Sequence, residues 1–165
     1  MITQLPEDPL SLAVEKRIGN RAGMVAPYHQ LGRLCESQGR LDEAERCYTT
    51  SLAIDENLGN ESGIAMTCRH LGRVAQAQRN FTGARQCYLR SLEICERLSD
   101  ERTTGTLCNQ LVSLAVDLRQ FDEATRWLVR SVQSFERAGE AAGVEKAKAA
   151  FAAVLGVVSP TERQT

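Results

Sequence analysis

The strongest constraint on the fold of this 165-residue chain is an internal repeat of forty residues. Residues 19–58 align without a gap on residues 59–98, and fifteen of the forty positions are identical. Residues 99–138 form a weaker third copy. Units of this kind hide their apolar faces against neighbouring units, so the repeat predicts a stacked array rather than one closed core.

Parts of two further copies flank these three. A fourth copy begins at Gly139. Residues 7–18 resemble the second half of an earlier copy, because three positions match: Ser11, Leu12 and Val14 stand where Ser51, Leu52 and Ile54 stand in the first copy. We therefore predict one array over residues 1–158, with a half repeat at 7–18, repeats at 19–58, 59–98 and 99–138, a capping helix at 139–158 and a flexible tail at 159–165.

Each unit carries two helical patterns. In residues 59–98 the first half places Ala65, Cys68 and Leu71 on one face, with the spacing of an α-helix. The second half repeats that spacing from Phe81 onward, and only a short segment separates the two. Short connections force antiparallel neighbours, so the sequence predicts an all-α fold built of helix pairs.

Local signals suggest where the helices begin and end. Gly59-Asn60 and Ser99-Asp100 are suited to end one unit and cap the next. Asp42, Thr82 and Asp122 recur at one place, where we expect them to cap the second helix of each unit. Pro27 falls inside the first predicted helix, which therefore either begins near Ala26 or is kinked.

Composition and charge exclude several function classes. The net charge is −1, whereas nucleic-acid-binding domains are usually basic. No apolar stretch approaches the length of a membrane span, and no signal peptide is visible, so we expect a cytoplasmic chain that binds neither nucleic acid nor membrane. The six cysteines form no Cys-x-x-Cys pair, and we interpret them as reduced, buried packing residues.

No motif indicates catalysis or metal binding. Cys68 and His70 lie two apart on one helix and so do not share a face, which argues against a metal site. No phosphate-binding loop or hydrolase motif occurs. We therefore predict that the chain is not an enzyme and holds no metal or cofactor.

The repeated residues resemble the tetratricopeptide-repeat family. Tyr28, Leu31-Gly32, Ala44, Tyr48 and Ser51 have the spacing of that family's pattern, and residues 59–98 repeat it. The forty-residue period is similar to the long-helix branch found in kinesin light chains, G-protein regulators and bacterial regulatory proteins. The chain departs from the family where Val112 replaces a glycine, and the family's proline after the second helix is absent.

The resemblance implies an α-solenoid, a right-handed superhelix of helix pairs whose concave face takes up a partner's peptide or helix. The first helices would line that face, which predicts these partner-binding residues: His29, Gln30, Arg33, Met66, Arg69, His70, Arg73, Thr106, Asn109, Gln110 and Ser113. The arginines favour an acidic partner. The alternative is a solvated polar face that binds nothing in particular.

We accordingly interpret the chain as a protein–protein interaction module or scaffold. A peptide-sensing regulatory domain of a larger protein is one alternative. Self-assembly is another, because the residues near Leu5, Leu10, Leu12 and Val14 would form an open end that could pair with another copy. The identity of the partner does not follow from the sequence.

Overall fold

The computed structural model describes the backbone of residues 9–157 and the side chains of residues 22–149 and Ala152. This part of the chain contains α-helices and short turns and no strand. The helices are α1 (Pro9–Ser37), α2 (Leu41–Leu58), α3 (Glu61–Ala77), α4 (Phe81–Arg97), α5 (Glu101–Asp117), α6 (Phe121–Arg137) and α7 (Ala141–Val157). The predicted all-α class of helix pairs packed in series is confirmed.

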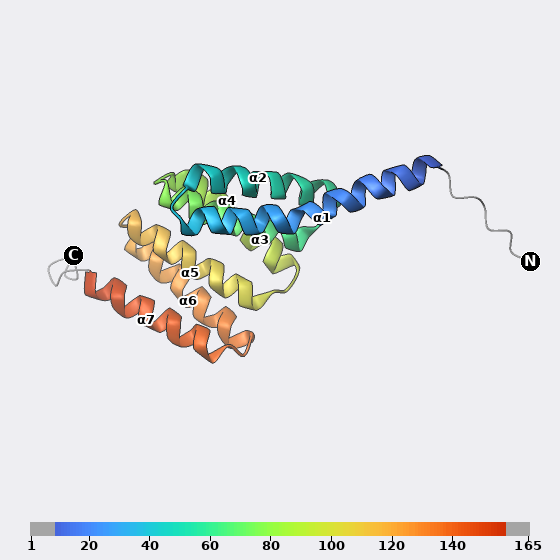
Figure 1. Ribbon diagram of the computed structural model, residues 1–165. Helices are drawn as coiled ribbons and strands as arrows, with labels where there is room; N and C mark the ends of the chain where they lie inside the picture. The colour runs from blue at the N-terminus through green and yellow to red at the C-terminus, as the bar shows by residue number, and fades with distance from the viewer. Residues whose placement is uncertain (1–8, 158–165) are drawn as a thin grey trace, which may run out of the picture. The chain divides into compact units, whose positions relative to one another are not determined.

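The chain divides into two compact units, residues 1–67 and 68–165, with the boundary inside α3. In the second unit, α4, α5, α6 and α7 pack one after another, each against the next (Figure 1). The predicted tail at 159–165 and Leu5 lie outside the described residues, as do the side chains of Leu10, Leu12 and Val14.

Left-handed residues end the helices at intervals of twenty residues. Positive φ angles between 56° and 72° occur at Gly39, Gly59, Arg79, Ser99, Arg119 and Gly139. At each place two backbone N–H groups donate back to the preceding helix: the N–H of Asp100 to the carbonyl of Cys95 at 2.9 Å, for example, and that of Ser99 to Glu96 at 3.1 Å. This is the Schellman arrangement, which satisfies carbonyls that the helix end would otherwise leave unpaired.

The residue after each left-handed residue stands immediately before the first residue of the next helix. Asn80 and Asp100 accept backbone N–H bonds through their side chains, from Gly83 and Thr103, both at 3.0 Å. Asn60 does the same for Gly63 at 3.2 Å.

The prediction that Asp42, Thr82 and Asp122 cap the second helices is wrong. These residues are the second residues of α2, α4 and α6. The N-cap positions belong to Arg40, Asn80 and Gln120, two residues earlier. The acidic side chains at 42 and 122 instead lie in the first helical turn, where they suit the positive end of the helix dipole.

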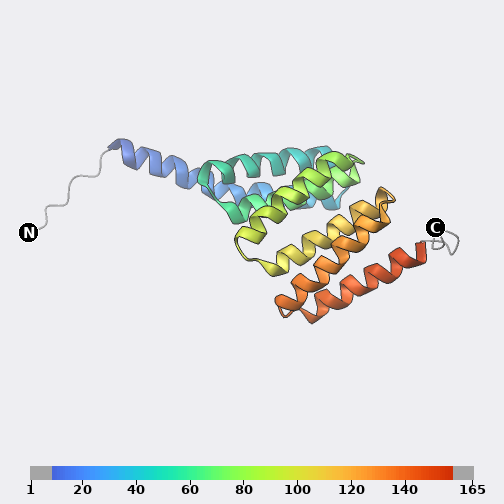
Figure 2. The same cartoon turned by 180° about the vertical axis from the view of Figure 1, so that it is seen from behind.

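The first helix is longer than the repeat predicted. α1 runs for 29 residues from Pro9, through Gly19, Asn20 and Pro27, without the break that separates the later units. One glycine or asparagine inside a helix costs about 1 kcal/mol or less relative to alanine, which does not force a helix to end. The N-terminal part of α1 extends beyond the end of α2 (Figures 1 and 2).

In the first unit, α1 packs on α2 around one tyrosine. Tyr48 is fully buried, and a Cβ at Gly32 would lie 2.7 Å from its ring. The Tyr48 hydroxyl donates to Glu36 at 3.0 Å, and the His29 ring meets the Tyr48 ring edge-on at 5.4 Å. Leu31, the residue before Gly32, is 45% exposed.

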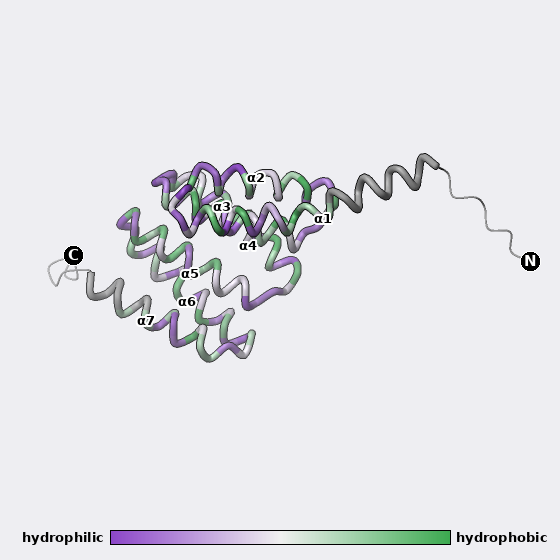
Figure 3. The backbone as a smooth tube through the Cα atoms, viewed as in Figure 1, coloured by the Kyte–Doolittle hydropathy of each residue, from purple (hydrophilic) through white to green (hydrophobic). Residues whose placement is uncertain are grey.

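The second unit repeats this contact and adds a larger core. Tyr88 takes the place of Tyr48, and a Cβ at Gly72 would overlap its ring. Around α5 and α6, buried side chains form one cluster: Val112, Ala115, Ala124, Leu128 and Ala147. Apolar and polar segments alternate along the helices, as expected where one face of each helix is covered (Figure 3).

No helix among the described residues combines the length and the apolar character that crossing a bilayer requires.

The left-handed positions predict opposite effects for two substitutions. Arg119→Gly should stabilise the protein by up to about 1 kcal/mol, because a side chain at positive φ costs more than the backbone freedom of glycine. Gly59→Arg should destabilise it by about 1 kcal/mol for the same reason. Urea unfolding measures both, and equal midpoints for the two variants would contradict the assignment.

The tyrosine contact predicts a steric effect at Gly72. Gly72→Ala should lower the free energy of unfolding by about 1–3 kcal/mol, because the new methyl group overlaps the Tyr88 ring. Gly23→Ala is the matched control: no atom lies within 4 Å of the new Cβ, and alanine favours a helix, so stability should rise by up to about 1 kcal/mol. A loss at both positions would show that packing on Tyr88 is not the cause.

Candidate functional site

In the second unit, α3 and α5 are joined by one glutamine side chain. The Gln76 amide donates to the hydroxyl of Ser113 at 3.2 Å and to the carboxylate of Asp117 at 2.6 Å. Its carbonyl oxygen accepts a hydrogen bond from the Tyr88 hydroxyl at 3.0 Å. The three bonds link α3 to α4 and to α5. The polar side chains around them form one face on α3 and α5. We call it the first-helix face and define it by Arg73, Gln76, Asn109, Ser113 and Asp117.

The structure places the sequence-predicted binding residues at very different depths. Five are exposed: Gln30, Arg33, Met66, Arg73 and Ser113. Four are half-buried: Arg69, Thr106, Asn109 and Gln110. His29 and His70 are only 9% and 7% exposed, so little of either ring is available to a partner.

Three of the half-buried residues are directed toward their own helix or its neighbours. Asn109 lies with its Oδ1 2.9 Å from the hydroxyl of Ser131 on α6, which donates to the Gly105 carbonyl at 2.8 Å. The Gln110 Oε1 is buried and has no hydrogen-bond partner among the described residues. The Thr106 hydroxyl donates to the Arg102 carbonyl at 3.1 Å.

Of the predicted residues, Arg73 and Ser113 are exposed on the first-helix face, and Asn109 lies one turn before Ser113 with its Oδ1 at the Ser131 hydroxyl. Gln76 and Asp117 complete this face, and sequence reasoning missed both. The available signal was the repeat itself, because Gln76 stands forty residues after Glu36, and each accepts the hydroxyl of the tyrosine twelve residues later.

The second helices of this unit are joined by ion pairs. Arg85 of α4 holds Glu123 of α6 through two contacts, at 2.6 and 3.0 Å, and this bond lowers the pKa of the Glu123 carboxyl. The Trp127 indole donates to the same carboxylate at 3.1 Å. Arg130 pairs with Glu96 of α4 and stacks over Trp127 at 5.6 Å. The charged side chains that join α4 and α6 therefore pair with one another.

The cysteines are packing residues. Cys35, Cys68, Cys95 and Cys108 are buried, and Cys47 and Cys87 are half-buried. Burial raises the pKa of the Cys95 thiol and raises that of Cys108 to about 12, so both stay protonated at neutral pH. Among the residues that the structure describes, no three acidic, histidine or cysteine side chains converge as metal ligands.

Comparison with known proteins identifies the repeats. Tetratricopeptide-repeat family profiles match residues 28–62 and residues 64–102. The chain contains tetratricopeptide repeats. No curated protein matches its sequence.

A similar fold is found among solved structures. The crystal structure of BtubC (BKLC) from P. vanneervenii is similar, with a TM-score of 0.64 and 22% sequence identity. The match covers 82% of this chain and 66% of that chain, so our chain spans just under two thirds of its length. At this identity the likeness concerns the fold alone. Tetratricopeptide repeats generally mediate protein–protein interactions.

One buried acid distinguishes the repeat at residues 19–58. Asp55 on α2 is fully buried, and its Oδ1 accepts a hydrogen bond from the Asn60 amide at 2.7 Å. Its Oδ2 has no hydrogen-bond partner among the described residues. Burial raises the pKa of the Asp55 carboxyl, and the Asn60 bond offsets only part of that effect.

Asp55 therefore predicts a pH-dependent gain on substitution. A raised folded-state pKa favours the protonated carboxyl, so its contribution to stability is present below the unfolded pKa and lost as pH rises through the folded one. Asp55→Asn should stabilise the protein at pH 7 by roughly 1 kcal/mol, the scale of one unsatisfied buried group. Urea unfolding at pH 7 and pH 4 should show the gain shrinking toward acid, and a gain that grows toward acid would contradict the assignment.

Proposed function

We propose that the first-helix face binds an acidic segment of a partner protein. The carrying observation is the Gln76 bridge, which ties α3, the helix that bears the exposed Arg73, to the exposed Ser113 of α5. A face fixed before binding loses little conformational entropy when a ligand arrives. The proposed role is therefore recognition rather than catalysis.

The arginines on and beside this face favour an acidic ligand. Arg73 contributes a guanidinium, which matches the geometry of a carboxylate. Arg69, one turn earlier on α3, adds positive charge from a half-buried position near Cys95. The one acid of the face, Asp117, accepts the hydrogen bond of Gln76.

Neutral groups beside the arginines suit a peptide backbone. The Ser113 hydroxyl is exposed, and the Asn109 amide is half-buried one turn away on the same helix. Such groups can donate to and accept from main-chain amides of an extended or helical segment.

Designed peptides test this proposal. The probes are three labelled 15-residue helical peptides that carry Glu, Gln or Lys at the same surface positions. Fluorescence anisotropy should show binding of the Glu peptide, weaker binding of the Gln peptide and none of the Lys peptide. Arg73→Glu should weaken binding of the Glu peptide at least about tenfold, the scale of one charge-assisted hydrogen bond.

The control is Arg126→Glu on α6, which makes the same charge change at an exposed residue of a second helix. It should leave the affinity within about twofold, since a distant exposed charge contributes little in physiological salt. Equal binding of the Glu and Gln peptides, or an equal loss in both arginine variants, would refute the proposal.

A further inference from the structure

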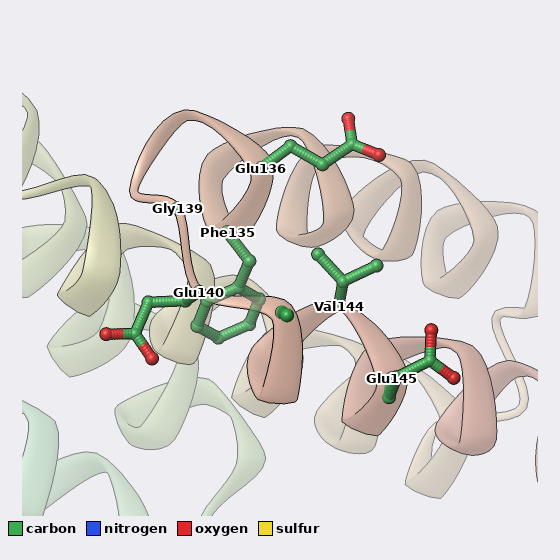
Figure 4. A pocket seen from close by; sticks show the side chains of 7 residues that line it. Phe135, Glu136, Gly139, Glu140, Val144 and Glu145 are labelled. Carbon is green, nitrogen blue, oxygen red and sulfur yellow. The ribbon is translucent and has the colours of Figure 1, made fainter.

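A pocket opens where α6 meets α7. It has a volume of about 370 Å³, and its apolar lining comes from Phe135 and Val144 (Figure 4). Glu136, Glu140 and Glu145 lie around it. Glu140 pairs with Arg102, and Glu145 pairs with Lys148 at 3.0 Å, so two of the three charges are already compensated.

The same place one repeat earlier is covered. A smaller pocket of about 160 Å³ is lined by five residues that stand forty positions before residues of the α6–α7 pocket: Cys95, Glu96, Ser99, Glu101 and Thr104. Three residues of α6 close it: Arg130, Ser134 and Arg137. Arg130 pairs with Glu96, and Arg137 pairs with Glu101 at 3.5 Å. In the described part of the chain, α7 is followed by no helix that could cover the α6–α7 pocket in this way.

The two pockets differ in chemistry. Where the covered pocket has Thr104, Glu101 and Cys95, the open one has Val144, Ala141 and Phe135. A helix that covers the open pocket as α6 covers the closed one must therefore be more apolar than α6 at the same positions. Only the carboxylate of Glu96 is kept in the open pocket, as Glu136.

The chain itself carries such a sequence 120 residues earlier. Leu10 and Val14 stand in register with Arg130 and Ser134, and Arg17 stands in register with Arg137. Leu10 and Val14 are thus apolar where α6 has Arg130 and Ser134, while Arg17 keeps the cation of Arg137. These residues belong to the N-terminal part of α1, which is helical from Pro9.

This part of α1 has no partner helix in the first unit. α1 has 29 residues and α2 has 18, and the N-terminal turns of α1 extend past α2 (Figures 1 and 2). A short helix alone in water is marginal, so these turns would gain stability from packing.

We propose that the N-terminal turns of α1, residues 9–17, dock over the α6–α7 pocket of a second copy of this chain. They would lie against α7 as α6 lies against α5. The contact joins two different surfaces, so it is head-to-tail and can add copies in series. It is independent of the first-helix face and of the proposal made for it.

Two single variants test this contact, one on each of its surfaces. Leu10→Glu and Val144→Glu each place a carboxylate in the apolar contact, beside Glu136. Multi-angle light scattering should show a mass that rises with concentration for the wild type and a monomer for each variant. Val129→Glu, at a 53% exposed site of α6 outside the pocket, should behave as the wild type.

A mixture of the two variants tests the head-to-tail contact directly. The Val144→Glu chain keeps an intact α1, and the Leu10→Glu chain keeps an intact pocket, so an equimolar mixture should form a one-to-one dimer and nothing larger. Circular dichroism checks that both variants keep their helices, and Val144→Gln replaces Val144→Glu if that variant unfolds. A wild type that is monomeric at every concentration, or a mixture that stays monomeric, would overturn the proposal and leave the pocket to a different partner.

Discussion

The structure depends on a backbone reversal that recurs every twenty residues. A helix must pair its last carbonyls, and here two main-chain N–H groups pair them while one residue turns left-handed. Because these bonds are made by the backbone, the reversal tolerates arginine at 79 and 119 and serine at 99 as well as glycine. The chain therefore keeps its period where its sequence varies.

Fixed helix length gives the surfaces their regularity. The helices from α3 to α7 each have 17 residues, so positions forty apart fall at equivalent places along the array. The Tyr48–Glu36 and Tyr88–Gln76 hydrogen bonds recur in this way. Function can then arise from single departures: Gln76 reaches the next first helix, and the α6–α7 pocket is the apolar version of a site that is polar one repeat before.

The sequence predicted the features that follow from period and spacing, namely an all-α class, antiparallel pairs and helix ends near Gly59 and Ser99. The sequence did not predict how deeply a side chain is buried, because that depends on how many helices pack against its own. Leu111 on α5 is 2% exposed because α4 and α6 both pack on α5, whereas Leu31 is 45% exposed on α1. Periodicity shows which residues share a face, but it does not show whether another helix covers that face.

Left-handed residues set the period of the helices, and nuclear magnetic resonance tests this directly. Intraresidue HN–Hα distances and three-bond couplings in a labelled sample report the sign of φ at each residue. We predict positive φ at Arg79, Ser99 and Arg119, three residues that seldom adopt it, and negative φ at their neighbours. Negative φ at those three positions, with helices still formed on either side, would contradict it.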